Sequence, residues 1–425
     1  MFGVTDMKEK FKSLTAIFYT PMLIYFIFFV IISLVAVASA TPLALVQYPG
    51  QNFVMRQLIF FGIGTAVAFI VVLFEIKWVR FLRWPLYIFF FVLLAIIWHM
   101  GDTEPCLNLP GMLVPCLNGA TRWFNLPGFQ LQPSEFMRIV LILIVADIIQ
   151  RHNEKFLHEN RTFKSDLWLI LKALFFVAPP LVLIYLQPDS GITLLILITT
   201  AFMLITAGIK WTYIIVIGAA AIFAGITFIN ILIHNPEILI DVAGFHEHQF
   251  TRIQGWLDPF ERIGDYGRQL AFGLIGMGSG GITGNGFQSF TTFFPEAHTD
   301  YIFAVIGMDF GLIGSSVVII ISLLFNFAIL NTAVLNRDHY NSHVCVGIFA
   351  SLMSQQFWNI AMTLGLLPIT GVTLPFISHG GSSVLASMIM FGLVMSSHVE
   401  GLTIKRNTTV YREDISYLEE KEVVV

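Results

Sequence analysis

Long apolar runs recur along the whole of this 425-residue chain and leave few folds open to it. A helix needs about 20 apolar residues to cross a bilayer. Runs near that length occur at about residues 20–40, 57–76, 84–100, 136–150, 167–186, 191–208, 211–233, 300–330, 343–366 and 382–399. With 56% hydrophobic and 12% charged residues, the chain is not an ordinary soluble domain. We therefore predict an all-α polytopic membrane protein with about ten transmembrane helices, forming a single membrane domain over residues 1–425.

The basic residues predict how the helices cross the membrane, because Lys and Arg are retained on the cytoplasmic side. The first run is too long for a usual signal-peptide core and is interpreted as an uncleaved helix. If the N-terminus is cytoplasmic, seventeen of the 23 Lys and Arg residues fall on the inner side and six on the outer side. Both termini are then cytoplasmic, at residues 1–19 and 400–425. A large extracytoplasmic loop at 234–299 separates the seventh and eighth helices.

The six outer basic residues are all arginine. Arg can bind phosphate or carboxylate through two parallel hydrogen bonds, so this composition indicates an anionic partner, although structural ion pairs also use Arg. We take Arg122, Arg252 and Arg268 as candidate ligands of an anion. The small net charge of -4 and the dispersed basic residues argue against a nucleic-acid partner.

Polar motifs gather where the even-numbered helices begin, at the predicted outer surface. They are Gln132-Pro133-Ser134-Glu135, Gln187-Pro188-Asp189-Ser190-Gly191, Pro295 to Asp300, and Ser378-His379-Gly380-Gly381-Ser382-Ser383. Four helix N-termini around one cavity would favour an anion such as phosphate. Taken one at a time, such residues are ordinary N-caps and first-turn prolines, and only their gathering favours a functional interpretation.

The motif Pro295-Glu296-Ala297-His298-Thr299-Asp300 is the most charged of the four. Charged groups at the mouth of a membrane helix are costly to desolvate and are usually functional. We take Asp300 as the working carboxylate. Glu296 and His298 are candidates for orienting the substrate or for helping to hold a metal.

Three other features have weaker links to function. The glycine-rich run from Gly276 to Gly286 lacks the preceding strand and following lysine of a P-loop, which favours a flexible, close-packed segment at the membrane surface. The trio from His246 to His248 could bind a metal but is more often simply solvated. Cys106 and Cys116 share one polar loop, and a local disulfide is possible if that loop is extracytoplasmic.

Taken together, the motifs resemble the SEDS family of cell-wall polymerases (shape, elongation, division and sporulation proteins), to which RodA, FtsW and SpoVE belong. The resemblance spans most of the chain. It is carried by Arg122-Trp123 through Glu135, Gln187-Pro188-Asp189, Leu257-Asp258-Pro259, Gly278 to Gly286, Pro295 to Ala304, and Pro368 to Ser383. The Leu-Asp-Pro stretch favours the RodA branch. Two positions depart from the family pattern: Met308-Asp309 stands where an acidic pair is usual, and His379 where tyrosine is usual.

The resemblance implies an inverting peptidoglycan glycosyltransferase that polymerises lipid II at the outer face of the bacterial cytoplasmic membrane, during cell elongation, division or sporulation. It also implies a class B penicillin-binding protein, a transpeptidase, as partner in the lipid bilayer. Asp300 would be the general base, and a divalent cation, Mg²⁺ or Mn²⁺, would help to stabilise the pyrophosphate leaving group. The substrate-binding candidates are Arg122, Trp123, Glu135, Asp189, Arg252, Arg268, Glu296, His298, Ser378 and Ser382.

Two functions of other classes stay open. A flippase or transporter of lipid II would also be polytopic, but it needs charged groups along the whole path across the membrane. Here the polar motifs crowd the outer edge. A non-catalytic scaffold that only recruits the transpeptidase would not need Asp300.

Overall fold

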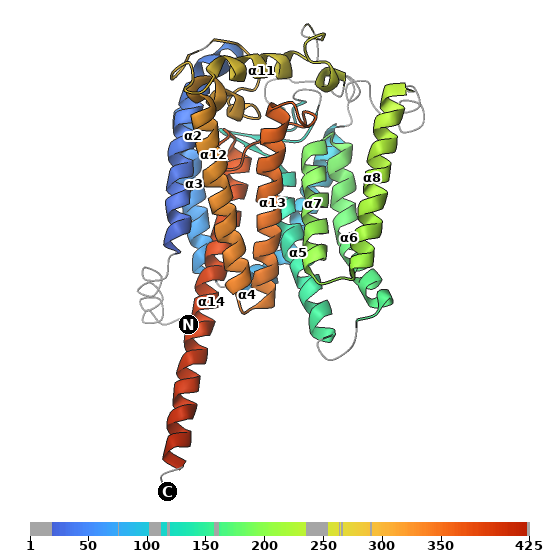
Figure 1. The fold of residues 1–425 in the computed structure, drawn as a ribbon, viewed down its shortest axis with the longest axis vertical. Helices are drawn as coiled ribbons and strands as arrows, with labels where there is room; N and C mark the ends of the chain where they lie inside the picture. Colours follow the sequence, from blue (N-terminus) through green and yellow to red (C-terminus); the bar gives the residue numbers. More distant parts are fainter. Residues whose placement is uncertain are drawn as a thin grey trace.

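The computed structural model describes residues 19–74, 76–101, 112–116, 120–156, 161–234, 254–262, 264, 267–289 and 291–422. Most of these residues are helical, and the long helices lie side by side in a bundle (Figure 1). In chain order the elements are α2 (Thr20–Gln47), α3 (Phe53–Leu73), α4 (Ile76–Gly101), β1 (Phe124–Leu126), β2 (Phe129–Leu131), α5 (Pro133–Lys155), α6 (Phe163–Leu186), α7 (Ser190–Thr206), α8 (Trp211–His234), α11 (Arg268–Gly280), α12 (Ile302–Leu335), α13 (His339–Thr363) and α14 (Gly381–Glu422).

Ten of these helices coincide with the ten apolar runs, so the all-α polytopic prediction is confirmed. Within the described residues, six helices are long and apolar enough to cross a membrane by themselves: α2, α3, α4, α6, α12 and the part of α14 up to Gly401. The short helix α11 lies across one end of the bundle, and α14 extends past the opposite end (Figure 1). Helix α2 begins at that second end too, as expected for two termini on one side of the membrane.

Helix α5 occupies the centre of the bundle. Seventeen successive residues, from Pro133 to Ile149, are buried, and α4, α6, α7, α13 and α14 all pack against it. A helix surrounded on all sides needs no polar face, which explains the unbroken apolar run in its middle. The helix continues beyond the predicted run at both ends, through the charged residues up to Lys155.

Helix α12 is interrupted at Gly311, whose φ of 64° and ψ of -159° are not helical. The glycine-rich loop that follows α11 supplies the backbone hydrogen bonds that the break removes. The carbonyls of Met308 and Asp309 accept bonds from Asn285 and Gly286, both at 3.0 Å, and the N–H groups of Leu312 and Ile313 donate to Gly281 and Ile282 at 3.0 and 3.2 Å. The run is therefore close-packed, as predicted, but the expectation that it is flexible is wrong: its first part, up to Gly280, is the end of α11, and backbone hydrogen bonds fix the rest against α12.

A small antiparallel hairpin of β1 and β2 pairs Phe124 with Leu131 and lies just before α5. In the loop before it, Cys116 is disulfide-bonded, whereas Cys345 in α13 is free and buried. Cys106, Arg252 and the His246–His248 trio lie outside the described residues.

Candidate functional site

Asp300 lies in a turn, residues 295–301, directly before α12. The Glu296 carbonyl accepts bonds from the N–H groups of Thr299 and Tyr301, each at 3.2 Å, and these bonds close the turn. Glu296 has a φ of 54°, in the left-handed region that favours glycine. Non-glycine residues are held there at a cost of about 1–3 kcal/mol and tend to cluster at functional sites.

Three consecutive carbonyl groups of this turn accept hydrogen bonds from outside it. The donors belong to α13 and to residues 364–380 between α13 and α14, which we call the linking segment. His298 accepts from the N–H of His379 at 2.9 Å, Thr299 from the hydroxyl of Ser378 at 2.7 Å, and Asp300 from the amide of Asn359 at 2.8 Å. The same Asn359 amide donates to the Val372 carbonyl at 2.7 Å, so one buried side chain binds the turn to the linking segment.

Asp300 is a partly exposed residue, although its backbone carbonyl is fixed. It lies close to Gly371 of the linking segment, where an added Cβ would be 3.3 Å from Asp300 Oδ2. Gly371 has a φ of 72°, so both its backbone conformation and the closeness of the carboxylate favour glycine. Asp300 thus combines an anchored backbone with partial exposure of the residue, which is compatible with a general base.

Glu296 connects the turn to the end of α2. Its Oε1 accepts from the Tyr48 hydroxyl at 3.1 Å and from the Gln47 amide at 3.5 Å, and its Oε2 accepts from the Thr299 hydroxyl at 2.8 Å. Burial, helped by the Glu296 charge, raises the pKa of Tyr48 to about 12, so the phenol keeps the proton that it donates. Because both carboxylate oxygens are engaged, Glu296 is better suited to positioning the turn than to taking a proton.

His298 and His379 form an uncharged pair beside the turn. Their ring centroids are 5.7 Å apart, and both rings contact Phe53, at 4.6 and 5.3 Å. The Nδ1 atom of His379 is 3.0 Å from the Oε1 of Gln57. Burial lowers the pKa of both imidazoles, that of His379 to about 3. Near neutral pH the pair is therefore neutral and supplies no positive charge to an anion.

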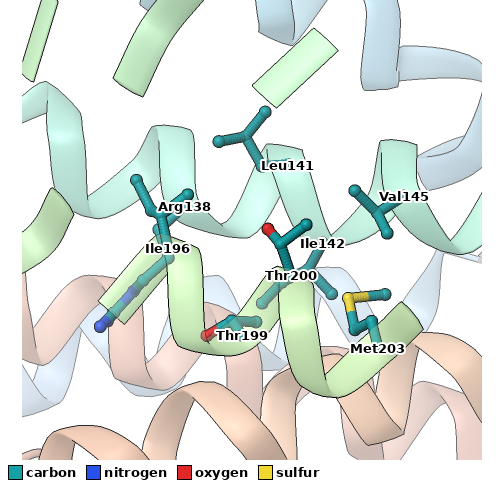
Figure 2. Close-up of a pocket in the computed structure, with 8 residues that line it drawn as sticks. All are labelled: Arg138, Leu141, Ile142, Val145, Ile196, Thr199, Thr200 and Met203. Atoms are coloured by element: carbon teal, nitrogen blue, oxygen red, sulfur yellow. The ribbon is translucent and has the colours of Figure 1, made fainter. Parts of the chain in front are cut away.

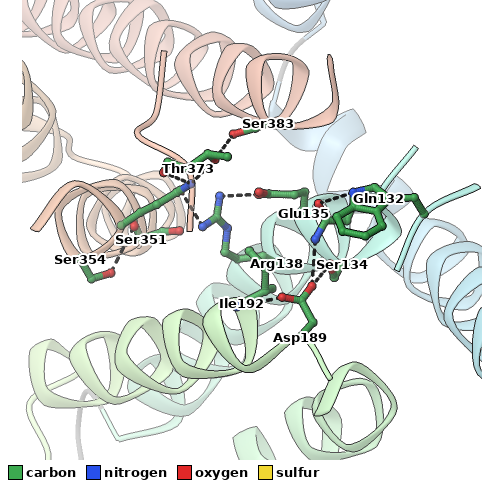
Figure 3. Close-up of polar contacts among 12 residues, drawn as sticks. Gln132, Ser134, Glu135, Arg138, Asp189, Ile192, Ser351, Ser354, Thr373 and Ser383 are labelled. Atoms are coloured by element: carbon green, nitrogen blue, oxygen red, sulfur yellow. Dashed lines mark hydrogen bonds and ion pairs between the residues drawn. The ribbon is translucent and has the colours of Figure 1, made fainter. Parts of the chain in front are cut away.

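A second polar cluster surrounds Asp189 at the start of α7 (Figure 3). Its carboxylate accepts from Arg122 at 3.3 Å, from Gln132 at 2.9 Å, from Ser134 at 3.0 Å and from the N–H of Ile192 at 3.5 Å, the last as N-cap of the helix. The side chain is buried. Burying a carboxylate costs several kcal/mol unless it is paired and hydrogen-bonded, and these four donors meet that requirement.

The cluster continues through α5 to the linking segment (Figure 3). Glu135 pairs with Arg138 at 2.9 Å, and Arg138 donates to Gln355 at 2.8 Å. Gln355 donates to the Thr373 carbonyl at 3.0 Å, and the Thr373 hydroxyl is 2.7 Å from that of Ser383. The linking segment is thus bonded both to the Asp300 turn and to the Glu135 pair. It holds the two clusters in a fixed relation.

The predicted site residues fall into two groups, both bonded to the linking segment or to the start of α14. One group is Asp300, Glu296, His298 and Ser378. The other is Arg122, Trp123, Glu135, Asp189 and Ser382, with the Trp123 indole donating to Gln132 at 3.2 Å and the Ser382 hydroxyl accepting from the Gln132 N–H at 2.9 Å. Arg268 begins α11, is exposed, and lies over the Phe293 ring at 5.9 Å.

A small cavity lies beside Arg138 between α5 and α7 (Figure 2). Its volume of about 10 Å³ is close to that of a single water-sized probe, so it is far too small for a sugar. Its lining residues are Arg138, Leu141, Ile142, Val145, Ile196, Thr199, Thr200 and Met203. A larger, mainly apolar pocket of about 440 Å³ lies between α2 and α12, lined by residues such as Val35, Ile306 and Phe310.

Residues 17–401 match the family model of the cell cycle proteins FtsW, RodA and SpoVE. The chain belongs to this family. The probable peptidoglycan glycosyltransferase FtsW of Wigglesworthia glossinidia brevipalpis is 32% identical over 295 residues, which cover 67% of this chain and 71% of the relative. Stage V sporulation protein E of Bacillus subtilis is 28% identical over 348 residues, covering 81% of this chain and 86% of the relative.

Solved structures of family members share the fold. RodA of Thermus thermophilus matches with a TM-score of 0.62 and 22% identity, covering 90% of this chain and 97% of RodA. A chain from a peptidoglycan synthase complex, described for its coordination of polymerization and crosslinking, matches with a TM-score of 0.71 and 23% identity, covering 90% and 98%. The apolar helices and the family together identify an integral protein of the bacterial membrane. Relatives from all three branches match, so the RodA branch stays a prediction.

The sequence interpretation missed several residues that the structure places at the site. Asn359 and Gln355 lie inside the apolar run of α13, and Tyr48 and Gln57 stand at the end of α2 and in α3. Amide side chains within a membrane helix are themselves a signal, because each needs a partner in a region without water. That signal could have marked Asn359 and Gln355, but it does not name their partners.

Proposed function

We propose that this protein is a peptidoglycan glycosyltransferase that polymerises lipid II at the outer face of the cytoplasmic membrane. Membership of the FtsW/RodA/SpoVE family supports this activity, as does the name peptidoglycan glycosyltransferase given to relatives such as the Wigglesworthia FtsW. The observation that carries the proposal is the Asp300 turn, in which three successive carbonyls are held from outside while Asp300 itself is a partly exposed residue.

In the proposed reaction Asp300 is the general base. A hydroxyl of the acceptor sugar attacks the anomeric carbon of the donor sugar, and its proton passes to the Asp300 carboxylate. The bond between that carbon and the pyrophosphate oxygen breaks, and undecaprenyl pyrophosphate leaves with the electron pair. Attack opposite the leaving group inverts the anomeric centre. A fixed base contributes roughly 100- to 10,000-fold to such a step.

The leaving pyrophosphate needs positive charge close by. Arg268, exposed at the start of α11 on the outer side, is available for this role. Arg122 already pairs with Asp189, so its contact with the substrate would have to use its remaining N–H groups. Each role remains a prediction, as does that of Arg252.

A divalent cation, Mg²⁺ or Mn²⁺, would neutralise part of the pyrophosphate charge when bound. Among the described residues no group of three or more His, Cys, Asp or Glu side chains could hold a metal. The residues present nevertheless fit Mg²⁺, which is commonly bound by one or two carboxylates together with substrate phosphates and water. Asp300 and Glu296 are the carboxylates of the turn that could contribute.

The expected partner is a class B penicillin-binding protein, which would crosslink the strands that this protein makes. The likeness to a chain of a synthase complex that coordinates polymerization and crosslinking supports the pairing. Lipid II would reach the site from the outer leaflet, where its sugars and pyrophosphate meet the Asp300 turn.

Polymerisation of purified lipid II tests the proposal, with a divalent cation and the cognate transpeptidase present. The variants are Asp300→Asn and, as control, Glu261→Gln, which removes an exposed carboxylate from the loop before α11. We expect glycan strands from wild type and control, and none from a well-folded Asp300→Asn protein. Equal polymer from all three would remove Asp300 from the mechanism. If wild type made no polymer but moved lipid II between leaflets, the protein would be a transporter.

A further inference from the structure

Three arginines surround one buried aspartate at the end of the bundle opposite the Asp300 turn. Asp147 lies twelve residues after Glu135 on α5, which is about 18 Å along the helix axis. Its Oδ1 is 2.6 Å from Arg80 Nη2, and its Oδ2 is 2.9 Å from Arg83 Nη2 and 2.8 Å from Arg151 Nε. The contributing helices, α4 and α5, pack directly against each other.

This cluster holds more positive charge than its carboxylate can neutralise. Three guanidinium groups share one carboxylate, whose side chain is only 5% exposed. Asp338, the N-cap of α13, accepts from the N–H of Tyr340 at 2.8 Å and adds a second negative charge nearby. Three arginines against two carboxylates still leave an excess of one positive charge. The Arg80 and Arg151 side chains are 29% and 59% exposed, so water screens part of their repulsion. Like charges held this close still repel each other, so a bound anion would stabilise the arrangement.

Lys and Arg are retained at the cytoplasmic ends of membrane helices, which explains why basic residues occur here. It does not explain why three arginines converge on one aspartate, because exposed lysines on flexible side chains would serve the retention equally well. Here the Arg83 side chain is 8% exposed, and its Nε is buried with no hydrogen-bond partner in the described part of the chain. The Arg80 guanidinium is fixed over the Tyr340 ring, at 4.7 Å from its centroid. Arg83 already donates to the Arg80 carbonyl and to Asp147, so it fixes the cluster and supplies charge. The remaining N–H groups of Arg80 and Arg151 are the forked donors that match the oxygens of a phosphate.

Aromatic side chains around the cluster indicate its depth in the membrane. Trp78 and Trp84, near the start of α4, are 46% and 36% exposed, and Arg83 lies over the Trp84 ring at 5.7 Å. Exposed tryptophans gather at the level of lipid headgroups, and basic pockets between helices on the cytoplasmic side bind anionic headgroups. We propose that Arg80, Arg83 and Arg151 form a binding site for a phosphate group, carried by an anionic phospholipid of the inner leaflet or by a soluble phosphate.

Binding to the purified full-length protein in neutral detergent tests this site at constant ionic strength. The probes are a short-chain phosphatidylglycerol, the matching phosphatidylcholine, and inorganic phosphate. The test variant is Arg80→Gln/Arg151→Gln, which keeps the buried pair of Arg83 with Asp147 and leaves the cluster neutral. The control is Arg337→Gln, which removes an exposed charge from the connection between α12 and α13 at the same end.

We expect wild type and control to bind phosphatidylglycerol equally and well above phosphatidylcholine, and the double variant to bind it about 30-fold more weakly. Binding of phosphatidylglycerol without inorganic phosphate would assign a lipid headgroup, and binding of both would show that the phosphate alone suffices. Unchanged affinity in a folded double variant, or equal binding of both lipids by wild type, would overturn the proposal. If that variant does not fold, Arg80→Lys/Arg151→Lys keeps the charge but removes the forked donors, and unchanged affinity there would refute forked recognition.

Discussion

Replacing Asn359 with alanine would remove the side chain that joins helix α13 to the Asp300 turn. The Asn359 side chain is fully buried and donates to two carbonyls, those of Asp300 and Val372. A buried carbonyl left without a partner costs about 1–3 kcal/mol, and loss of a partly buried bond costs about 0.5–1.5 kcal/mol. We therefore expect Asn359→Ala to lower the free energy of unfolding by about 2–4 kcal/mol.

The same change should lower activity more than its effect on stability explains. A misplacement of about 1 Å at a reacting group can cost 100-fold in rate, and the Asp300 carbonyl would lose its outside anchor. The measurement is the polymerisation rate per folded molecule, with the folded fraction taken from thermal unfolding in the same detergent. We expect a rate about 100-fold below wild type at a temperature where the variant is folded.

Asn326→Ala is the matched control for this experiment. Asn326 is a buried asparagine of α12 that donates to Gln356 at 2.5 Å and has no hydrogen bond to the turn. Its replacement should cost about 1–3 kcal/mol of stability and leave the rate per folded molecule near that of wild type. If the folded Asn359→Ala protein polymerised within about threefold of this control, the idea that α13 positions Asp300 would be wrong.

Three further changes probe the surroundings of the turn. Gly284→Ala would place a Cβ 2.2 Å from a carbonyl oxygen of α12 and should destabilise the protein by several kcal/mol. Gly286 is also at positive φ but faces open space, so Gly286→Ala should cost about 1 kcal/mol. Thermal unfolding of the two variants compares these costs. His379 has a folded-state pKa of about 3, below its unfolded value of 6.5, so its contribution to stability is complete above pH 6.5 and is lost as the pH falls. The free energy of unfolding should therefore decrease by about 2 kcal/mol between pH 6.5 and 5. The variant His379→Gln should show a smaller decrease over the same pH range. Tyr48→Phe removes one hydrogen-bond donor to Glu296. It should lower the free energy of unfolding by about 1 kcal/mol and the polymerisation rate several-fold. An unchanged rate would show that the link from α2 to the turn is dispensable.

The fold was predictable because a bilayer restricts what a chain can do. Each apolar run had to become a helix, since backbone groups in lipid must bond within their own segment. The ends of α5 were harder to predict. The apolar run stops where charged residues begin, whereas the helix continues to Lys155. Residues such as Arg151 and Lys155 are good helix formers, so leaving the apolar region does not end the helix.

The site was predictable only where its residues are close together in the sequence. The Asp300 turn and the Asp189 cap are local motifs. The bond from Asn359 to Asp300 joins positions 59 residues apart, and the bond from Arg138 to Gln355 joins positions 217 apart. No spacing rule reveals such pairs, because they depend on which helices pack side by side. The ion pair of Arg122 with Asp189 shows the same limit. From the sequence alone, Arg122 could either bind an anionic ligand or form a structural ion pair, and its partner was not predictable.

The glycine-rich run explains how a membrane helix can be broken directly beside a rigid turn. The Gly311 break would leave backbone groups of α12 without partners, at a cost of several kcal/mol each in lipid. The loop bonds to both sides of the break. Close approach requires glycine there, since a Cβ at Gly280 would lie 2.1 Å from the Gly307 carbonyl. Because Gly284 and Gly286 direct their N–H groups to the protein backbone, they are not available to bind phosphate. The run therefore braces the first two turns of α12, and through them the Asp300 turn, while the charge for the substrate must come from side chains or a bound cation.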